Sequence, residues 1–131
     1  MDIIITSWAL RSYLRIHHSN QLPEDEYWGT IRPDILRLRQ LTDDPKFQVG
    51  KFWSPAAGHG ISVQNGFKMK WHQVGDGAVQ LRLPILLLDD AFLCEAYVKD
   101  GDSTERRALA KFAVHAQRIR EGNYEICGRL G

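Results

Sequence analysis

The chain has 131 residues, 44% of them hydrophobic, and a formal net charge of +1. This length suits one well-buried core and is short for two, so we expect residues 1–131 to form a single domain. The near-neutral charge excludes the overall basicity by which many nucleic-acid-binding proteins attract phosphate, so any such attraction must come from a local cluster of cations.

The first 18 residues are expected to form a strand that leads directly into a helix. Residues 2–6 are a mainly β-branched run, which is typical of a strand, and Ser7 is a suitable N-cap for the helix that follows. Apolar residues then recur at helical spacing over 9–16. We interpret the adjacent His17 and His18 as a feature of the helix C-terminus, because adjacent helical residues diverge and no further metal-ligand pattern accompanies them.

A second helix is expected to start at Pro23, because proline suits the first helical position and three acidic residues follow it. Pro33 lies inside the same apolar stripe, and it should kink or split the helix near residues 30–32. Residues 42–65 contain prolines and glycines without sustained periodicity. They are expected to form a long loop with one short strand near 61–63.

The central part of the chain alternates apolar and polar residues over three strand-length segments, 67–72, 79–88 and 92–99. Turn residues separate the segments at 75–77 and 89–90, so the pattern predicts an antiparallel meander. One face of this sheet is expected to be apolar and to include Phe92, Cys94, Ala96 and Val98 from the third segment. The opposite face carries Lys68, Lys70, His72, Arg82, Glu95, Tyr97 and Lys99.

This polar face has two interpretations. One face of most antiparallel sheets contacts water, and alternation alone indicates geometry without chemistry. The composition favours a polyanion-binding face, since four of its side chains are basic and only Glu95 is acidic. His72 and Tyr97 can in addition take part in proton transfer.

The C-terminal part is expected to form a helix and a last strand. Asp102 and Glu105 have the spacing of a capping box, with Ser103 as an alternative cap, and the apolar stripe over 109–119 predicts an amphipathic helix. Alternation over 124–131 predicts a strand at the sheet edge. The opposite helix face is basic and is expected to be solvated: Arg106, Arg107, Lys111, Arg118 and Arg120.

Several classes of site lack their sequence signatures. Cys94 and Cys127 do not have metal-site spacing, and the chain has no GxSxG, HExxH, Walker-type or GxGxxG motif. Neither a metal nor another cofactor is expected. No apolar run approaches the length of a membrane span, and the start lacks the basic region of a signal peptide, so a cytoplasmic protein is expected.

The order of these elements resembles the RelE/ParE superfamily of bacterial type II toxins. The similarity depends on the opening IIITSWALRSYLRI and on the segments FKMKW, VQLRLPILLL and AFLCEAYVKDGDSTERRALAKFAVHAQRI, whereas the region 23–65 is longer than the family pattern. The resemblance implies an α+β fold with a small antiparallel sheet, N-terminal helices on one face and a helix after the central strands. It also implies a toxin: members of the RelE branch cleave mRNA on the ribosome, those of the ParE branch poison gyrase, and a cognate antitoxin neutralises each.

RNA cleavage without a metal needs a group that removes the 2′-hydroxyl proton, cations that stabilise the transition state, and an acid for the leaving oxygen. The polar face offers the required residue types. We assign Arg82 and Lys70 to phosphate stabilisation, His72 to general acid or base catalysis, and Lys68 and Lys99 to binding of the RNA backbone.

The resemblance adds Tyr124 as a second candidate for proton transfer, because RelE-type toxins often carry a useful aromatic residue near the C-terminus. Tyr97 and Arg106 are further candidates for nucleic-acid binding. The leading hypothesis is therefore a ribosome-associated mRNA endoribonuclease with no membrane partner. The alternative is a non-catalytic interaction module or a gyrase-directed inhibitor, which the near-neutral net charge favours.

Overall fold

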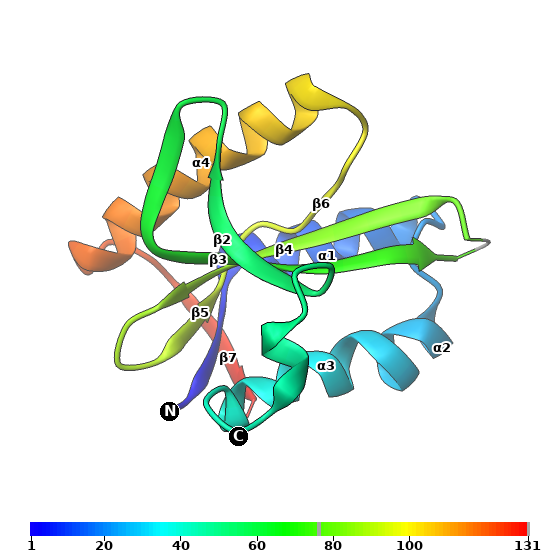
Figure 1. Ribbon diagram of the computed structural model, residues 1–131, viewed down its shortest axis with the longest axis horizontal. Helices are drawn as coiled ribbons and strands as arrows, with labels where there is room; N and C mark the ends of the chain where they lie inside the picture. Colours follow the sequence, from blue (N-terminus) through cyan, green and yellow to red (C-terminus); the bar gives the residue numbers. More distant parts are fainter. Residues whose placement is uncertain (76, 131) are drawn as a thin grey trace.

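The computed structural model describes residues 1–75 and 77–130, and within them the chain forms a mixed sheet of seven strands (Figure 1). Strand β1 runs parallel to β5 and antiparallel to β7, whereas the neighbours from β2 to β5 pair antiparallel. The α+β class is confirmed, but the sheet is larger than expected and is not wholly antiparallel. Its strands, in spatial order, are β2 (Trp53–Gly58), β3 (Ile61–Val74), β4 (Val79–Leu87), β5 (Ala91–Leu93), β1 (Ile3–Thr6) and β7 (Ile126–Leu130), with β6 (Tyr97–Val98) also paired to β4.

Helical segments cover both faces of the sheet. Figure 1 shows α4 on one side, and α2 and α3 on the other. No helix among the described residues has the length and apolarity needed to cross a membrane. The segments are α1 (Ser7–His18), α2 (Glu24–Glu26), the π-helical η1 (Tyr27–Ile31), α3 (Arg32–Leu36), the 3₁₀ segments η2 (Arg37–Gln40) and η3 (Pro45–Gln48), and α4 (Asp102–Arg120).

The N-cap of α1 differs from the prediction, whereas the helix break near Pro33 agrees with it. The expected N-cap Ser7 is wrong by one residue, because the Thr6 side chain accepts a hydrogen bond from the backbone N–H of Ala9 at 3.3 Å. The split near Pro33 is confirmed as a change of helix type. A π-helical turn, closed by an N–H to C=O bond from Arg32 to Tyr27, ends at Ile31, two residues before this proline.

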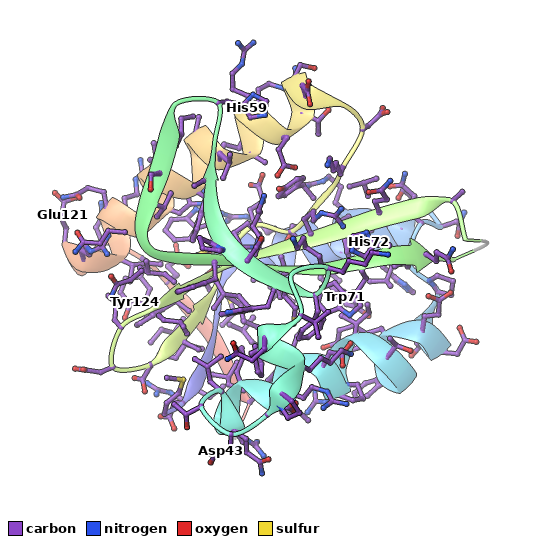
Figure 2. The ribbon with its side chains drawn as sticks, in the orientation of Figure 1. Asp43, His59, Trp71, His72, Glu121 and Tyr124 are labelled. Atoms are coloured by element: carbon purple, nitrogen blue, oxygen red, sulfur yellow. The ribbon has the colours of Figure 1, made fainter. Side chains whose placement is uncertain are left out.

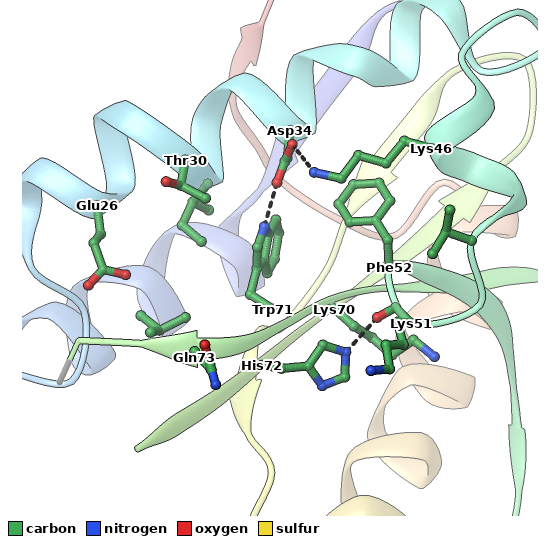
Figure 3. A pocket seen from close by; sticks show the side chains of 13 residues that line it. Glu26, Thr30, Asp34, Lys46, Lys51, Phe52, Lys70, Trp71, His72 and Gln73 are labelled. Atoms are coloured by element: carbon green, nitrogen blue, oxygen red, sulfur yellow. Dashed lines mark hydrogen bonds and ion pairs between the residues drawn. The ribbon is translucent and has the colours of Figure 1, made fainter. Parts of the chain in front are cut away.

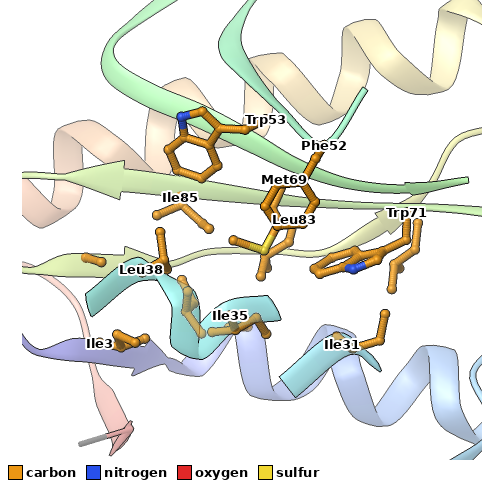
Figure 4. Close-up of a cluster of buried hydrophobic side chains, with 14 of the residues drawn as sticks. Ile3, Ile31, Ile35, Leu38, Phe52, Trp53, Met69, Trp71, Leu83 and Ile85 are labelled. Carbon is orange, nitrogen blue, oxygen red and sulfur yellow. The ribbon is translucent and has the colours of Figure 1, made fainter. Parts of the chain in front are cut away.

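The sheet separates two hydrophobic cores. Adjacent residues of a strand point to opposite faces, and so Ile3 and Ile4 belong to different cores. The core on the side of α3 is shown in Figure 4 and includes Ile31, Ile35, Leu38, Met69, Trp71, Leu83 and Ile85. The core beneath α4 includes Leu86, Phe92, Cys94, Leu109, Phe112, Ala116 and Ile119.

The apolar stripe predicted for α4 is thus confirmed, and the helix packs closely on β3. A Cβ atom at Gly66 would lie 2.7 Å from Cε2 of the fully buried Phe112, which real side chains do not allow. Glycine at this position therefore lets α4 approach the sheet. The predicted last strand is also confirmed, since β7 lies at the sheet edge beside β1.

The expected long loop at 42–65 is wrong. Its second half forms β2 and the start of β3, which pair antiparallel as a hairpin. The sequence did not predict β2, because Pro55 cannot donate a backbone hydrogen bond to a neighbouring strand and therefore argues against a strand. The structure tolerates it because β2 is the outer strand of the sheet and has a neighbour only on the side of β3.

The expected third strand is interrupted. Residues 94–96 separate β5 from β6, and the direction of the side chains changes across this break. Phe92 and Cys94 enter the core beneath α4, whereas Ala96 and Val98 pack against the opposite core. The prediction of one common apolar face for these four residues is therefore wrong.

Helix α1 supports the interruption. The Ser12 hydroxyl accepts a hydrogen bond from the backbone N–H of Ala96 at 2.9 Å, so this group is satisfied outside the sheet. The consequence is that Tyr97 lies on the same face as α4. The turn expected at 75–77 includes Asp76, which lies outside the described residues, while Gly75 and Gly77 have positive φ angles of 67° and 85°.

Candidate functional site

Three polar residues lie side by side across β3, β4 and β6. Lys70 pairs with Arg82, and Arg82 pairs with Tyr97. Directly paired residues on antiparallel strands point to the same face, so the three side chains form a row on the side of α4. Arg82 and Tyr97 are buried, and Lys70 is half-buried. The predicted grouping of these residues on one face is confirmed, although α4 partly covers that face.

Glu105 brings a buried carboxylate from α4 into this row. One oxygen accepts a hydrogen bond from Lys68 Nζ at 2.7 Å, and the other accepts one from the Tyr97 hydroxyl at 2.9 Å. Burial acts to raise the pKa of Glu105, but the bonds from Lys68 and Tyr97 outweigh it and the net shift is downward. The carboxylate is therefore held in its charged form.

The expected capping box at the start of α4 is wrong. The N-cap is Gly101, which has no side chain to accept a hydrogen bond, and Asp102 is the first helical residue. Glu105 turns toward the sheet instead, where its side chain is only 9% exposed. By local sequence, a carboxylate three residues after a helix start can either cap the helix or bind a cation on the sheet. Lys68, which is 37 residues away in the chain, binds Glu105 and thereby holds it toward the sheet.

Arg82 supplies a buried positive charge in the middle of the row. Its Nη1 donates to the carbonyl oxygens of Trp71 and Leu81 at 3.2 and 3.1 Å, and its Nη2 donates to Gln80 Oε1 at 2.9 Å. Burial lowers the pKa of this guanidinium. Since the backbone bonds use both Nη1 hydrogens, Arg82 acts on a ligand mainly through its charge and through its remaining N–H groups.

Lys70 lies half-buried among other cations. Burial lowers the pKa of its ammonium group, and the positive charges of Lys68, Arg82 and Lys99 lower it further, against an opposing effect of Glu105. Its amine is thus neutral in a larger fraction of molecules than that of an ordinary lysine. We call Lys68, Lys70, Arg82, Tyr97, Lys99 and Glu105 the sheet cluster.

His72 lies next to the sheet cluster and faces a different opening. It is exposed, and its Nε2 lies 2.6 Å from the backbone oxygen of Lys51. A cavity of about 360 Å³ lies here, between the end of β3 and the segment from η1 to α3, and both His72 and Lys70 line it (Figure 3). His72 therefore shares this cavity with Lys70 of the sheet cluster.

Two other candidates lie apart from the cluster. The Tyr124 ring packs edge-on against Phe92, with ring centroids 5.5 Å apart, and belongs to the core beneath α4. Figure 2 shows it at the opposite side of the molecule from His72. Arg106 is exposed on α4. The structure thus gathers Lys68, Lys70, Arg82, Tyr97 and Lys99, and it leaves Tyr124 outside this group.

A second buried carboxylate, that of Asp34, was not predicted by any pattern in the sequence. Its Oδ2 accepts a hydrogen bond from Trp71 Nε1 at 2.8 Å, and its Oδ1 accepts bonds from Lys46 Nζ at 2.8 Å and Arg37 Nε at 3.0 Å (Figure 3). An aspartate directly after Pro33 looks like an ordinary acidic residue of a first helical turn. Its partners show that it instead joins α3 to β3.

Within residues 1–75 and 77–130, no three His, Cys, Asp or Glu side chains are grouped so that they could hold a metal ion. Comparison with protein-family models, with curated proteins and with solved structures finds no match for this chain. The geometry and charge of the sheet cluster are therefore the features of the described residues that bear on function.

Proposed function

We propose that the chain binds RNA over the sheet cluster and cleaves it without a metal ion, as a toxin similar to the RelE branch. The observation that supports this proposal is the excess of positive charge. Lys68, Lys70, Arg82 and Lys99 surround the single carboxylate of Glu105. Burial lowers the pKa of Lys70, and the charges of Lys68, Arg82 and Lys99 lower it further. A surplus of cations on a partly covered face is suited to phosphate groups.

We assign the proton-transfer role first to Lys70, because it is half-buried among other cations and its pKa is lowered. In the proposed reaction its neutral amine removes the proton of a ribose 2′-hydroxyl, and the 2′-oxygen forms a bond to the adjacent phosphorus. The bond from phosphorus to the 5′-oxygen breaks, which leaves a 2′,3′-cyclic phosphate. The charges of Arg82 and Lys68 stabilise the intervening transition state.

His72 supplies the proton for the leaving 5′-oxygen in this scheme. The pairing of β3 with β4 is irregular after Trp71, and Lys70 and His72 both line the cavity at this end of β3, so both can reach one phosphate bound there. Tyr124 has no role in this reaction, because it is partly buried and packs against the core beneath α4, away from the sheet cluster.

The partners follow from the same proposal. The substrate is mRNA on the ribosome, and a cognate antitoxin neutralises the chain by covering the sheet cluster. The rival function is a non-catalytic interaction module or a gyrase-directed inhibitor. One observation favours the rival: Glu105 already engages Lys68 and Tyr97, which reduces the charge available to RNA.

Substitution of Lys70 tests the proposal in cells. The wild-type chain, Lys70→Met and Lys70→Arg are each expressed under an inducible promoter in a bacterial host, and growth, translation and transcript 5′ ends are measured. Arginine keeps the positive charge but does not deprotonate near neutral pH. We therefore expect wild type to arrest growth with new 5′ ends, and both variants to lose cleavage.

A measurement of RNA affinity should distinguish Lys70→Arg from Lys70→Met. Lys70→Arg should retain the wild-type affinity for a non-cleavable 2′-O-methyl RNA, while Lys70→Met should bind more weakly. Arg39→Met serves as the control, because Arg39 is exposed on η2, away from the sheet cluster. Growth arrest with intact transcripts would support the interaction module, and cleavage that persists in Lys70→Met would remove Lys70 from the mechanism.

A further inference from the structure

A second basic site lies beyond the sheet cluster, between α1 and α4. A cavity of about 530 Å³ opens there, which is within the usual range of roughly 300–1,000 Å³ for ligand sites. Cations come from both of its walls, with one arginine on α1 and two basic residues on α4. We call this cavity the interhelical cleft, and its polar lining comprises Arg15, Glu95, Tyr97, Thr104, Arg107 and Lys111.

The positive charge of the interhelical cleft is only partly neutralised. Lys111 is paired with Glu95 at 3.2 Å, and its side chain is 62% exposed. Arg15 makes a long contact of 3.4 Å from Nη2 to the backbone oxygen of Ala96. Arg107 has no hydrogen-bond or ion-pair partner among residues 1–75 and 77–130. Three cations therefore face one carboxylate, and two guanidinium groups retain donors for a ligand.

The interhelical cleft and the sheet cluster share a residue. Tyr97 lines the cleft, and its hydroxyl donates to Glu105, whose other carboxylate oxygen binds Lys68. Tyr97 and Glu105 thus link the sheet cations Lys68 and Lys70 to the cleft that carries Arg15 and Arg107. A single extended polyanion fits this arrangement better than two separate small anions.

We propose that the interhelical cleft is a second RNA subsite, where Arg15 and Arg107 hold phosphodiester groups of the strand that crosses the sheet cluster. This inference rests on the proposed function. Guanidinium groups bind phosphate through two parallel hydrogen bonds, which suits contacts that must fix the direction of a strand. The carboxylate of Glu95 repels phosphate and is paired with Lys111, so the phosphodiester groups contact Arg15 on one wall and Arg107 on the other.

The test compares two double variants with the same loss of charge. Arg15→Ala with Arg107→Ala removes both guanidinium groups of the cleft. Arg39→Ala with Arg129→Ala is the control, because both residues are exposed and lie on η2 and β7, outside the cleft. Affinity for a 2′-O-methyl RNA of about twelve nucleotides is measured by fluorescence anisotropy over a range of salt concentrations. Circular dichroism and thermal unfolding verify that every variant is folded.

We expect the cleft variant to bind this RNA about tenfold more weakly than wild type at physiological salt. The slope of log affinity against log salt should fall in magnitude by about 1.4, which corresponds to two lost phosphate contacts on a single strand. The control should keep the wild-type affinity and slope. A cleft variant that behaves like the control would overturn the second subsite while leaving the sheet cluster untouched.

The same measurements distinguish failure of the cleft from failure of the proposed function. Binding that depends on Arg15 and Arg107 but not on Lys70 would keep the cleft and refute the sheet cluster as the RNA site. A wild-type chain that binds no RNA would overturn both proposals.

Discussion

Two buried carboxylates lie on opposite sides of the sheet, and their surroundings differ in charge balance. Asp34, beside α3, accepts hydrogen bonds from Trp71, Lys46 and Arg37. Arg37 also binds Asp44 at 2.8 Å, so two cations serve two carboxylates. This network is neutral as a whole, and its bonds join α3 and η3 to β3.

Glu105, beside α4, has the opposite balance. It accepts bonds from Lys68 and Tyr97, while Lys70 and Lys99 add positive charge that no second carboxylate offsets in the sheet cluster. In a network with equal numbers of cations and carboxylates the charges neutralise one another, and the network stabilises the fold. A network with surplus positive charge can bind an anionic ligand. The contrast supports a structural role for Asp34 and the proposal that the surroundings of Glu105 bind a ligand.

The largest effect on stability should follow from removal of the Asp34 carboxylate. Asp34→Ala leaves the indole N–H of Trp71 and a partly buried ammonium group without an acceptor. We expect the free energy of unfolding to fall by about 4 kcal/mol in chemical denaturation. Asp43→Ala, at an exposed position nearby in the chain, should change it by no more than about 0.5 kcal/mol. Equal effects of the two substitutions would contradict a structural role for Asp34.

Glu105→Gln should cost less stability and should improve binding. The amide oxygen can still accept the bond from Tyr97, so we expect a loss of about 2 kcal/mol in the free energy of unfolding. Removal of the one carboxylate beside Lys68 should tighten RNA binding by about 1 kcal/mol, or roughly fivefold. Glu121→Gln, at an exposed position after α4, is the matched control. Weaker RNA binding by Glu105→Gln would show that the carboxylate does not compete with phosphate.

Acid titration should reveal the charged state of Glu105. Because its pKa is lower in the folded protein than the usual 4.5, its contribution to stability is present above pH 4.5. That contribution is lost as the pH falls through the lowered pKa of the folded state. Denaturation at a series of pH values should therefore show a steeper acid decline for wild type than for Glu105→Gln. Parallel profiles would refute the linkage.

The smallest effect should come from a histidine that joins α1 to α4. The buried His115 ring stacks on Trp8 with centroids 4.0 Å apart, and burial lowers the pKa of this imidazole. The negative charge of Glu95 opposes this shift, and the positive charges of three basic neighbours support it: Arg118, Lys111 and Arg11.

Folding therefore favours the neutral form of His115. Its contribution to stability is present above the usual pKa of 6.5 and declines as the pH falls below that value. His115→Phe keeps an aromatic ring against Trp8 but cannot titrate. Thermal unfolding between pH 7 and pH 5 should thus show a smaller decline for this variant than for wild type, and an unchanged decline would assign the pH dependence to other groups.

Part of the candidate site follows from local pattern. Alternation over 67–72 and 79–83 places Lys68, Lys70 and Arg82 on one face, because strand side chains have a period of two whatever the sheet later packs against. The 3.6-residue stripe in 109–119 defines the buried side of α4 for the same reason. Such periodic features need no knowledge of distant residues.

Other parts depend on residues far apart in the chain. The pattern of Asp102 and Glu105 satisfies a capping box, yet Glu105 binds Lys68 once α4 lies over the sheet. The break at 94–96 is stabilised by Ser12 of α1, a contact over 84 residues that reverses the direction of the side chains before Tyr97. Local sequence carries no signal for either event.

The sequence by itself determined the α+β class, the alternating faces of β3 and β4, the apolar stripe of α4 and the break at Pro33, since each is set by spacing along the chain. Only the tertiary structure decided that α4 covers the basic face, that Glu105 lies among its cations, and that Tyr97 joins the sheet cluster to the interhelical cleft. The physical reason is that an amphipathic helix matches any apolar surface of suitable width. Its partner is selected by long-range packing and charge pairing, which periodicity does not encode.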